Sequence, residues 1–219
     1  MARLMDENTQ QQVRNLLSGL TKPVVLHLFT QEFECGYCKE THQIAEELAE
    51  LSDLVTLQIH DFVDEHELAD ALHIDKIPAM AVMGEGDVDY GIRFYGIPSG
   101  YEFTSLIESL LLTGSQAVEL DKSMQAFIDT LEEPLHLQVF VTPTCPYCPQ
   151  AVVMAHQLAF ASDKIRADMV EVTEFPYLGQ QYHVMGVPRT VINENTYIEG
   201  AVPPAMLLEK LKTAVRATS

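Results

Sequence analysis

The stretches Cys35-Gly-Tyr-Cys38 and Cys145-Pro-Tyr-Cys148 contain every cysteine of this chain of 219 residues. Two thiols three residues apart, at the start of a helix, lie on one face and can close a small disulfide ring. The two motifs are 110 positions apart, and the same step separates Ile77-Pro78 from Val187-Pro188. A repeat this long predicts two duplicated domains rather than a solenoid, since each copy is large enough to hold its own core.

The composition is that of an ordinary globular protein without a membrane span. Apolar residues make up 47% of the chain, and no stretch approaches the roughly 20 consecutive apolar residues of a membrane helix. The amino-terminal residues lack the apolar region of a signal peptide, so we expect a cytoplasmic protein. Structural disulfides are uncommon in that compartment, which favours a reactive or metal-binding role for the cysteine pairs. The formal charge of −19 argues against a nucleic-acid partner.

Hydrophobic periodicity predicts the same order of elements in each copy. In the first copy we expect helices at 8–20, 39–51, 64–72 and 101–112, and strands at 24–30, 55–62, 79–83 and 88–95. In the second copy we expect helices at 117–131, 145–160, 177–183 and 204–215, and strands at 135–142, 165–172, 189–192 and 196–199. The short polar stretch Thr113-Gly-Ser115 is the expected boundary, which gives units 1–114 and 115–219.

This order resembles the thioredoxin or glutaredoxin unit. Each strand–helix–strand portion requires a right-handed parallel crossover, and the terminal hairpin adds antiparallel strands. The fold class expected is therefore α/β, with two tandem thioredoxin-like (glutaredoxin-like) units, each a mixed central sheet flanked by helices.

The whole chain resembles the protein disulfide oxidoreductases of thermophilic archaea and bacteria, also called glutaredoxin-like proteins. The resemblance rests on the two motifs, on the matched X-Pro sites and on the segment Tyr95-Gly-Ile-Pro-Ser-Gly-Tyr-Glu-Phe103. It implies dithiol–disulfide exchange with protein substrates and no cofactor other than the redox-active disulfides. It also implies regeneration by a thioredoxin-reductase-like flavoenzyme that uses a nicotinamide cofactor. One departure is the low content of Lys and Arg, 13 residues, because hyperthermophile proteins tend to be rich in Lys and Glu.

Cys35 and Cys145 are the predicted nucleophiles, because the start of a helix favours a thiolate through its unsatisfied N–H groups and its dipole. Cys38 and Cys148, expected to be more buried, would resolve the mixed disulfide.

The surroundings of the two motifs differ in charge. Glu32, Glu34 and Glu40 lie close to the first pair in sequence and disfavour a thiolate. No acid lies close to the second pair, and Arg189 is expected beside Cys145 and favours its thiolate. The second site is therefore predicted to be the more active one.

The peptide bonds Ile77-Pro78 and Val187-Pro188 are predicted to be cis, because the thioredoxin-like fold places a cis proline opposite the cysteines. Backbone groups of the residue before each proline would bind a substrate strand. Tyr37 and Tyr147, within the motifs, either contact substrate or shield the thiols.

Three alternatives stay open at this point. The chain could be a dedicated electron relay to one partner, such as a peroxiredoxin. It could instead hold zinc, although paired motifs in zinc sites are usually about 15–20 residues apart. It could also hold an iron–sulfur cluster between two subunits, which needs four thiolates.

Overall fold

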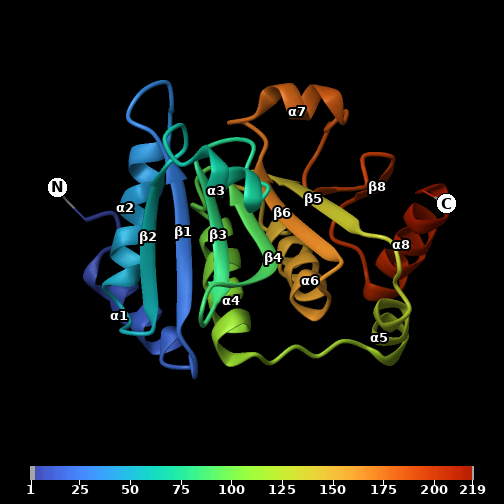
Figure 1. Ribbon diagram of the computed structural model, residues 1–219, viewed down its shortest axis with the longest axis horizontal. Helices are drawn as coiled ribbons and strands as arrows, with labels where there is room; N and C mark the ends of the chain where they lie inside the picture. Colours follow the sequence, from blue (N-terminus) through green and yellow to red (C-terminus); the bar gives the residue numbers. More distant parts are fainter. Residues whose placement is uncertain (1–2, 219) are drawn as a thin grey trace.

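The computed structural model describes residues 3–218, which form a single mixed sheet of eight strands with helices packed against it (Figure 1). The helices are α1 (Glu7–Leu17), α2 (Cys38–Ala49), α3 (His66–Ala71), α4 (Glu102–Ser115), α5 (Lys122–Asp129), α6 (Cys148–Ala161), α7 (Pro176–Gln181) and α8 (Pro204–Thr218). The strands are β1 (Val24–Thr30), β2 (Val55–Asp61), β3 (Ala79–Gly84), β4 (Val88–Tyr95), β5 (Leu135–Val141), β6 (Ile165–Glu171), β7 (Arg189–Ile192) and β8 (Thr196–Glu199).

The strand order is β2-β1-β3-β4-β6-β5-β7-β8. In the first half β1 pairs parallel with β2 and antiparallel with β3, and β3 pairs antiparallel with β4. In the second half β5 pairs parallel with β6 and antiparallel with β7, and β7 pairs antiparallel with β8. The repeated pattern confirms the predicted tandem thioredoxin-like architecture.

The two halves are joined by a parallel pairing of β4 with β6, which Figure 1 shows side by side at the centre of the sheet. One hydrophobic cluster runs through both halves and includes Leu26 and Leu28 of β1 together with Leu137 and Val139 of β5. Helices α4 and α6 pack against each other behind the centre of the sheet. Burial of apolar surface therefore links the halves as well as stabilising each one.

The expected boundary segment is part of a helix. Helix α4 continues through Ser115, and Gln116 ends it in the left-handed conformation with φ 55°. Thr113 and Gly114 are buried, and a Cβ on Gly114 would lie 2.4 Å from Leu20 Cδ2, so this turn packs tightly against the first half. The chain between α4 and α5 begins only at residue 116. The division into units 1–114 and 115–219 stays a prediction.

The helix at the second motif begins later than expected, and the helix at the first motif begins one residue earlier. Helices α2 and α6 start at Cys38 and Cys148, the second cysteine of each pair. The first cysteines lie in the turn that precedes each helix. Neither helix has a side-chain N-cap, so the first-turn N–H groups remain directed toward this turn.

Candidate active site

Both cysteine pairs are disulfide-bonded, with 5.5 Å between the Cα atoms of each pair. Each disulfide lies between the carboxyl end of a strand and the start of a helix. Cys35–Cys38 lies between β1 and α2, and Cys145–Cys148 lies between β5 and α6. Since β1 and β5 occupy matching places in the two halves, duplication of the unit duplicates the redox group.

The second cysteine of each pair is the more deeply buried one. Cys38 and Cys148 are 2% and 0% exposed, as expected from the sequence. Cys145 is also buried, whereas Cys35 is half-buried. The first disulfide is therefore more open to solvent than the second.

Ile77-Pro78 and Val187-Pro188 are both cis, which confirms the prediction of their geometry. The Pro78 carbonyl accepts a hydrogen bond from Gly96 N at 2.9 Å, and the Pro188 carbonyl accepts one from Gly200 N at 2.8 Å. Val187 packs against the core cluster that contains the second disulfide. The substrate-binding role of these residues stays a prediction.

Tyr37 and Tyr147 are both exposed, the latter more so. An exposed ring next to a disulfide suits contact with a bound polypeptide, because it combines apolar surface with a hydroxyl. Both roles expected from the sequence, contact with substrate and shielding of the thiols, stay predictions.

Acidic side chains surround the first disulfide in space as well as in sequence. A pocket of about 470 Å³ beside it is lined by residues of the β1–α2 loop, of α2 and of β2: Thr30, Gln31, Glu32, Cys35, Cys38, Lys39, His42, Ile59 and Asp61. Glu34 is exposed and Glu40 is half-buried. The acids found near the first disulfide thus agree with the predicted difference in charge between the two sites.

Arg189 is buried, and its charge is paired with a carboxylate. Its Nη1 donates a hydrogen bond to Glu199 Oε1 at 2.6 Å, and its guanidinium stacks over the Tyr197 ring at 4.2 Å from the centroid. The sequence did not predict these partners. Because the pairing offsets the positive charge, the effect of Arg189 on the Cys145 thiolate stays a prediction.

Glu102, in the first turn of α4, is a candidate functional residue that sequence reasoning missed. Its side chain is fully buried, and burial raises its pKa to about 7, although a hydrogen bond from Ser105 Oγ at 2.6 Å acts in the opposite direction. Its Oε1 has no hydrogen-bond partner. The helix is anchored beside the second motif, because Tyr101 N donates to the Pro143 carbonyl at 2.9 Å. The only signal in the sequence is an acid at the start of an otherwise apolar helix.

Comparison with known proteins agrees with this geometry. A family model described as a thioredoxin domain matches residues 135–213. The amino-terminal domain of alkyl hydroperoxide reductase AhpF from Enterococcus faecalis superposes with a TM-score of 0.86 at 28% identity, covering 94% of this chain and 98% of that one. A protein disulfide oxidoreductase from Aeropyrum pernix superposes with a TM-score of 0.90 at 24% identity, covering 98% and 96%. The chain therefore has a tandem thioredoxin fold. Its two disulfides fit thiol–disulfide redox chemistry.

Curated relatives of this tandem thioredoxin-fold protein are longer than the chain itself. Alkyl hydroperoxide reductase AhpF of Escherichia coli is 26% identical over 210 residues, which are 96% of this chain and 38% of the relative. A protein named NADH dehydrogenase from Bacillus subtilis is 22% identical over 215 residues, which are 98% and 39%. The chain therefore spans less than half the length of these relatives.

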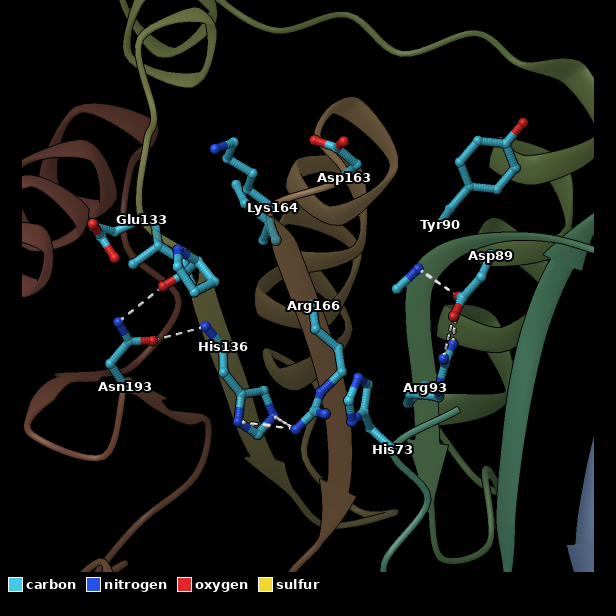
Figure 2. A pocket seen from close by; sticks show the side chains of 14 residues that line it. His73, Asp89, Tyr90, Arg93, Glu133, His136, Asp163, Lys164, Arg166 and Asn193 are labelled. Atoms are coloured by element: carbon cyan, nitrogen blue, oxygen red, sulfur yellow. Dashed lines mark hydrogen bonds and ion pairs between the residues drawn. The ribbon is translucent and has the colours of Figure 1, made fainter. Parts of the chain in front are cut away.

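A larger pocket, of about 540 Å³, is lined by the side chains drawn in Figure 2. It lies at the opposite end of the strands from the disulfides. Leu135 and Ile165, the first residues of β5 and β6, line it, whereas the cysteines follow the carboxyl ends of the strands. Arg93 is fully buried there and donates hydrogen bonds from Nη1 and Nη2 to the Asp89 carboxylate at 2.9 and 2.6 Å.

Asp168 is the second charged centre near this pocket. It is 1% exposed, and its Oδ2 lies 2.5 Å from His136 Nε2, while Arg166 Nε lies 3.4 Å from Oδ1. Burial acts to raise the Asp168 pKa, but His136 and Arg166 lower it by more, so the pKa is lowered overall. The charges at this end of the tandem thioredoxin-fold protein are thus compensated internally, which is typical of a structural role.

Within residues 3–218 no cluster of three or more His, Cys, Asp or Glu side chains is arranged to bind a metal ion. No helix in the same range is long and apolar enough to cross a membrane.

Proposed function

We propose that the chain is a protein disulfide oxidoreductase that reduces, oxidises or rearranges disulfides of other proteins through both cysteine pairs. The observation that carries the proposal is the repeated placement of a disulfide before the first turn of a helix, with a cis proline in each unit. The helix start favours a thiolate, and the residue before each proline is proposed to offer its backbone groups to a substrate strand.

In the reducing direction the first cysteine, Cys35 or Cys145, attacks one sulfur of a substrate disulfide as a thiolate. The substrate S–S bond breaks, a mixed disulfide forms, and one substrate thiolate leaves and takes up a proton. The second cysteine, Cys38 or Cys148, then loses its proton and attacks the first. This step releases the second substrate thiol and forms the disulfide of the protein. Two electrons pass to the substrate, and the reverse sequence oxidises a dithiol.

Glu102 is proposed to accept the proton of Cys148 in the resolving step. The carboxyl group is buried on α4, which packs against α6, and its Oε1 is unpartnered. Its pKa of about 7 suits a group that takes up and returns a proton near neutral pH.

The substrate polypeptide is proposed to bind along Ile77-Pro78 or Val187-Pro188, with Tyr37 or Tyr147 in contact with it. Arg189 is proposed to bias the second site toward the thiolate. A flavoenzyme of the thioredoxin reductase type is the proposed electron donor in the cytoplasm, since the protein itself needs no cofactor for this chemistry.

A second candidate function is electron relay to a peroxidase such as a peroxiredoxin. It is favoured by the similarity of this chain to part of an alkyl hydroperoxide reductase, in an alignment that covers 96% of this chain. Peroxide consumption by a peroxiredoxin, with this chain as the only source of dithiol, would test it directly. A metal or cluster module is distinguished from both by zinc analysis and visible absorbance of the purified protein.

Insulin reduction by two double variants tests the leading proposal. Cys145→Ser/Cys148→Ser is expected to lose more activity than Cys35→Ser/Cys38→Ser, because acids surround the first pair. In single variants, mixed disulfide with substrate should accumulate in Cys148→Ser and Cys38→Ser but not in Cys145→Ser and Cys35→Ser. Full insulin reduction by a variant that combines all four serine substitutions would refute the role of the cysteines. A greater loss from the first-site double variant would reverse the ranking of the two sites.

A further inference from the structure

The strand that follows each motif helix has different neighbours at the two disulfides. At the second site that strand is β6, whose outer side is paired with β4. At the first site the matching strand is β2, which forms the edge of the sheet and pairs only with β1 (Figure 1). The same structural position is therefore covered at the second site and open at the first.

A segment of the first half, Gly96–Tyr101, occupies this position at the second site. Ile97 N donates a hydrogen bond to Glu174 Oε1 at 2.6 Å, just beyond the carboxyl end of β6. Tyr101 N donates to the carbonyl of Pro143, two residues before Cys145, at 2.9 Å. The second site thus binds a turn-containing segment of polypeptide through two backbone N–H groups.

The first site has counterparts of both acceptors. Asp64 lies 110 positions before Glu174, and Phe33 lies two residues before Cys35, as Pro143 does before Cys145. The turns that carry the two acids are alike, because the Asp61 carboxylate accepts a hydrogen bond from Asp64 N at 3.0 Å and the Glu171 carboxylate accepts one from Glu174 N at 2.9 Å. Asp64 is exposed and has no side-chain partner among the described residues.

A groove is present where the second site holds Gly96–Tyr101. The 470 Å³ pocket beside the first disulfide adjoins another of about 390 Å³, and the two share Gln31, Glu32 and Asp61. We define the acidic groove as the residues that line these two pockets. The second pocket is lined by Gln31, Glu32, Phe33, Glu34, Asp61, Val63 and Asp64.

The chemistry of the acidic groove defines what it can bind. Four carboxylates line it, from Glu32, Glu34, Asp61 and Asp64, against the single ammonium of Lys39. Apolar side chains accompany them, and the most exposed are those of Phe33, at 77%, and Val63, at 65%. An occupant therefore needs positive side chains, some apolar surface and free backbone N–H groups.

We propose that the acidic groove binds a Lys- or Arg-rich segment of a partner polypeptide, through counterparts of the two acceptors that bind Gly96–Tyr101 at the second site. A backbone N–H of the partner bonds the Asp64 carboxylate. Another bonds the Phe33 carbonyl, which also accepts a hydrogen bond from Gln31 Nε2 at 2.5 Å. This inference rests on the proposed function and adds a substrate-binding surface to it. The bound segment brings its own cysteine or disulfide to Cys35. The second site cannot accept such a segment at the matching position because its own chain fills it.

Binding is measured with the oxidised full-length protein and a fluorescent, cysteine-free peptide of alternating lysine and valine, so that no redox step takes part. The double variant Asp64→Asn/Glu32→Gln should weaken binding about tenfold, since an exposed ion pair contributes about two- to fivefold. Added salt should weaken binding to the unaltered protein. The matched control Asp53→Asn/Glu108→Gln removes the same charge from exposed sites outside the groove and should leave affinity unchanged. A peptide with glutamate in place of lysine should not bind.

Equal loss in the groove variant and in the control would overturn the proposal, because binding would then reflect net charge alone. So would equal binding of the lysine and glutamate peptides.

A second measurement separates this proposal from the proposed function. In Cys145→Ser/Cys148→Ser only the first disulfide can react, and its reduced form should reduce a lysine-rich peptide disulfide faster than a glutamate-rich one. Absence of exchange with either peptide, while groove-dependent binding persists, would contradict the redox role of the first pair and leave the groove standing. Equal rates with both peptides would contradict delivery of the substrate by the groove.

Discussion

The two redox sites differ most in what the rest of the chain supplies to them. The first half provides the second site with a buried carboxyl group, Glu102, and with the segment Gly96–Tyr101 that covers its flank. Among residues 3–218 the second half provides nothing equivalent to the first site, where β2 remains an open edge lined by acids. Tandem duplication followed by packing of β4 against β6 thus makes two similar units unequal, because only one unit of the pair gains a neighbour on that side.

The largest expected effect of breaking this asymmetry comes from Gly100→Ala. Gly100 has φ +59°, and a Cβ there would lie 2.2 Å from the Pro143 carbonyl oxygen. Left-handed backbone costs a non-glycine residue about 1–2 kcal/mol and overpacking about 1–3 kcal/mol more, so we expect roughly 3–4 kcal/mol of lost stability. Denaturant unfolding measures this loss. The control is Gly36→Ala in the first motif, where a Cβ meets nothing within 4 Å. A stability loss below that of the control would mean that the segment Gly96–Tyr101 does not pack tightly against Pro143.

Glu102→Gln should remove a pH dependence from both stability and activity. The pKa of the buried carboxyl is about 7 and exceeds its unfolded value, so the folded state holds the extra proton. Stability should therefore decline as pH rises from about 4.5 to 7, by roughly 3 kcal/mol in total. The glutamine variant should lack this decline and be the more stable protein at pH 8. Unfolding at several pH values checks the slope.

The same variant should slow reduction of substrate by the second site above pH 7, where the carboxylate of the unaltered protein accepts the Cys148 proton. The pH–rate profile of Cys35→Ser/Cys38→Ser with and without Glu102→Gln isolates this effect. Identical profiles would show that the carboxyl group affects stability alone.

The smallest effect is expected from Glu174→Ala, which removes the acceptor for Ile97 N. A backbone N–H bonded to a carboxylate contributes about 1–2 kcal/mol, and partial exposure of Glu174 places the loss near 1 kcal/mol. Hydrogen exchange should accelerate at Ile97 more than at Gly200, whose N–H bonds Pro188. Asp64→Ala at the first site, which has no such bond to lose, is the matched control and should leave stability unchanged.

The sequence predicted those features that repeat at a fixed step. The strands flanking each motif, the hairpins and both cis bonds follow from apolar runs and X-Pro sites that recur 110 positions apart. These features depend on short stretches of chain or on pairings within one unit. Local pattern and the family resemblance together were sufficient for them.

Features that arise between the two halves could not be predicted in this way. The pairing of β4 with β6 is set by the complementary edges of two sheets, which no periodicity encodes. Burial of Glu102 accompanies that pairing, since it lies on α4, which packs against α6 at the junction. The extension of α4 through Ser115 depends instead on tight packing of Gly114 against Leu20 and Val24 of the first half. The sequence predicted Arg189 beside a cysteine motif. It did not show that the guanidinium would pair with Glu199 and stack on Tyr197.

The junction also governs what each half would become alone. Ile92 and Phe94 of β4 lie opposite Ala167 and Met169 of β6, and all four side chains are buried. A half separated from its neighbour would present this apolar strand with unpaired N–H and C=O groups, which is a template for aggregation. Each half acts as the cap of the other, so that the duplication protects a vulnerable edge as well as doubling a redox group.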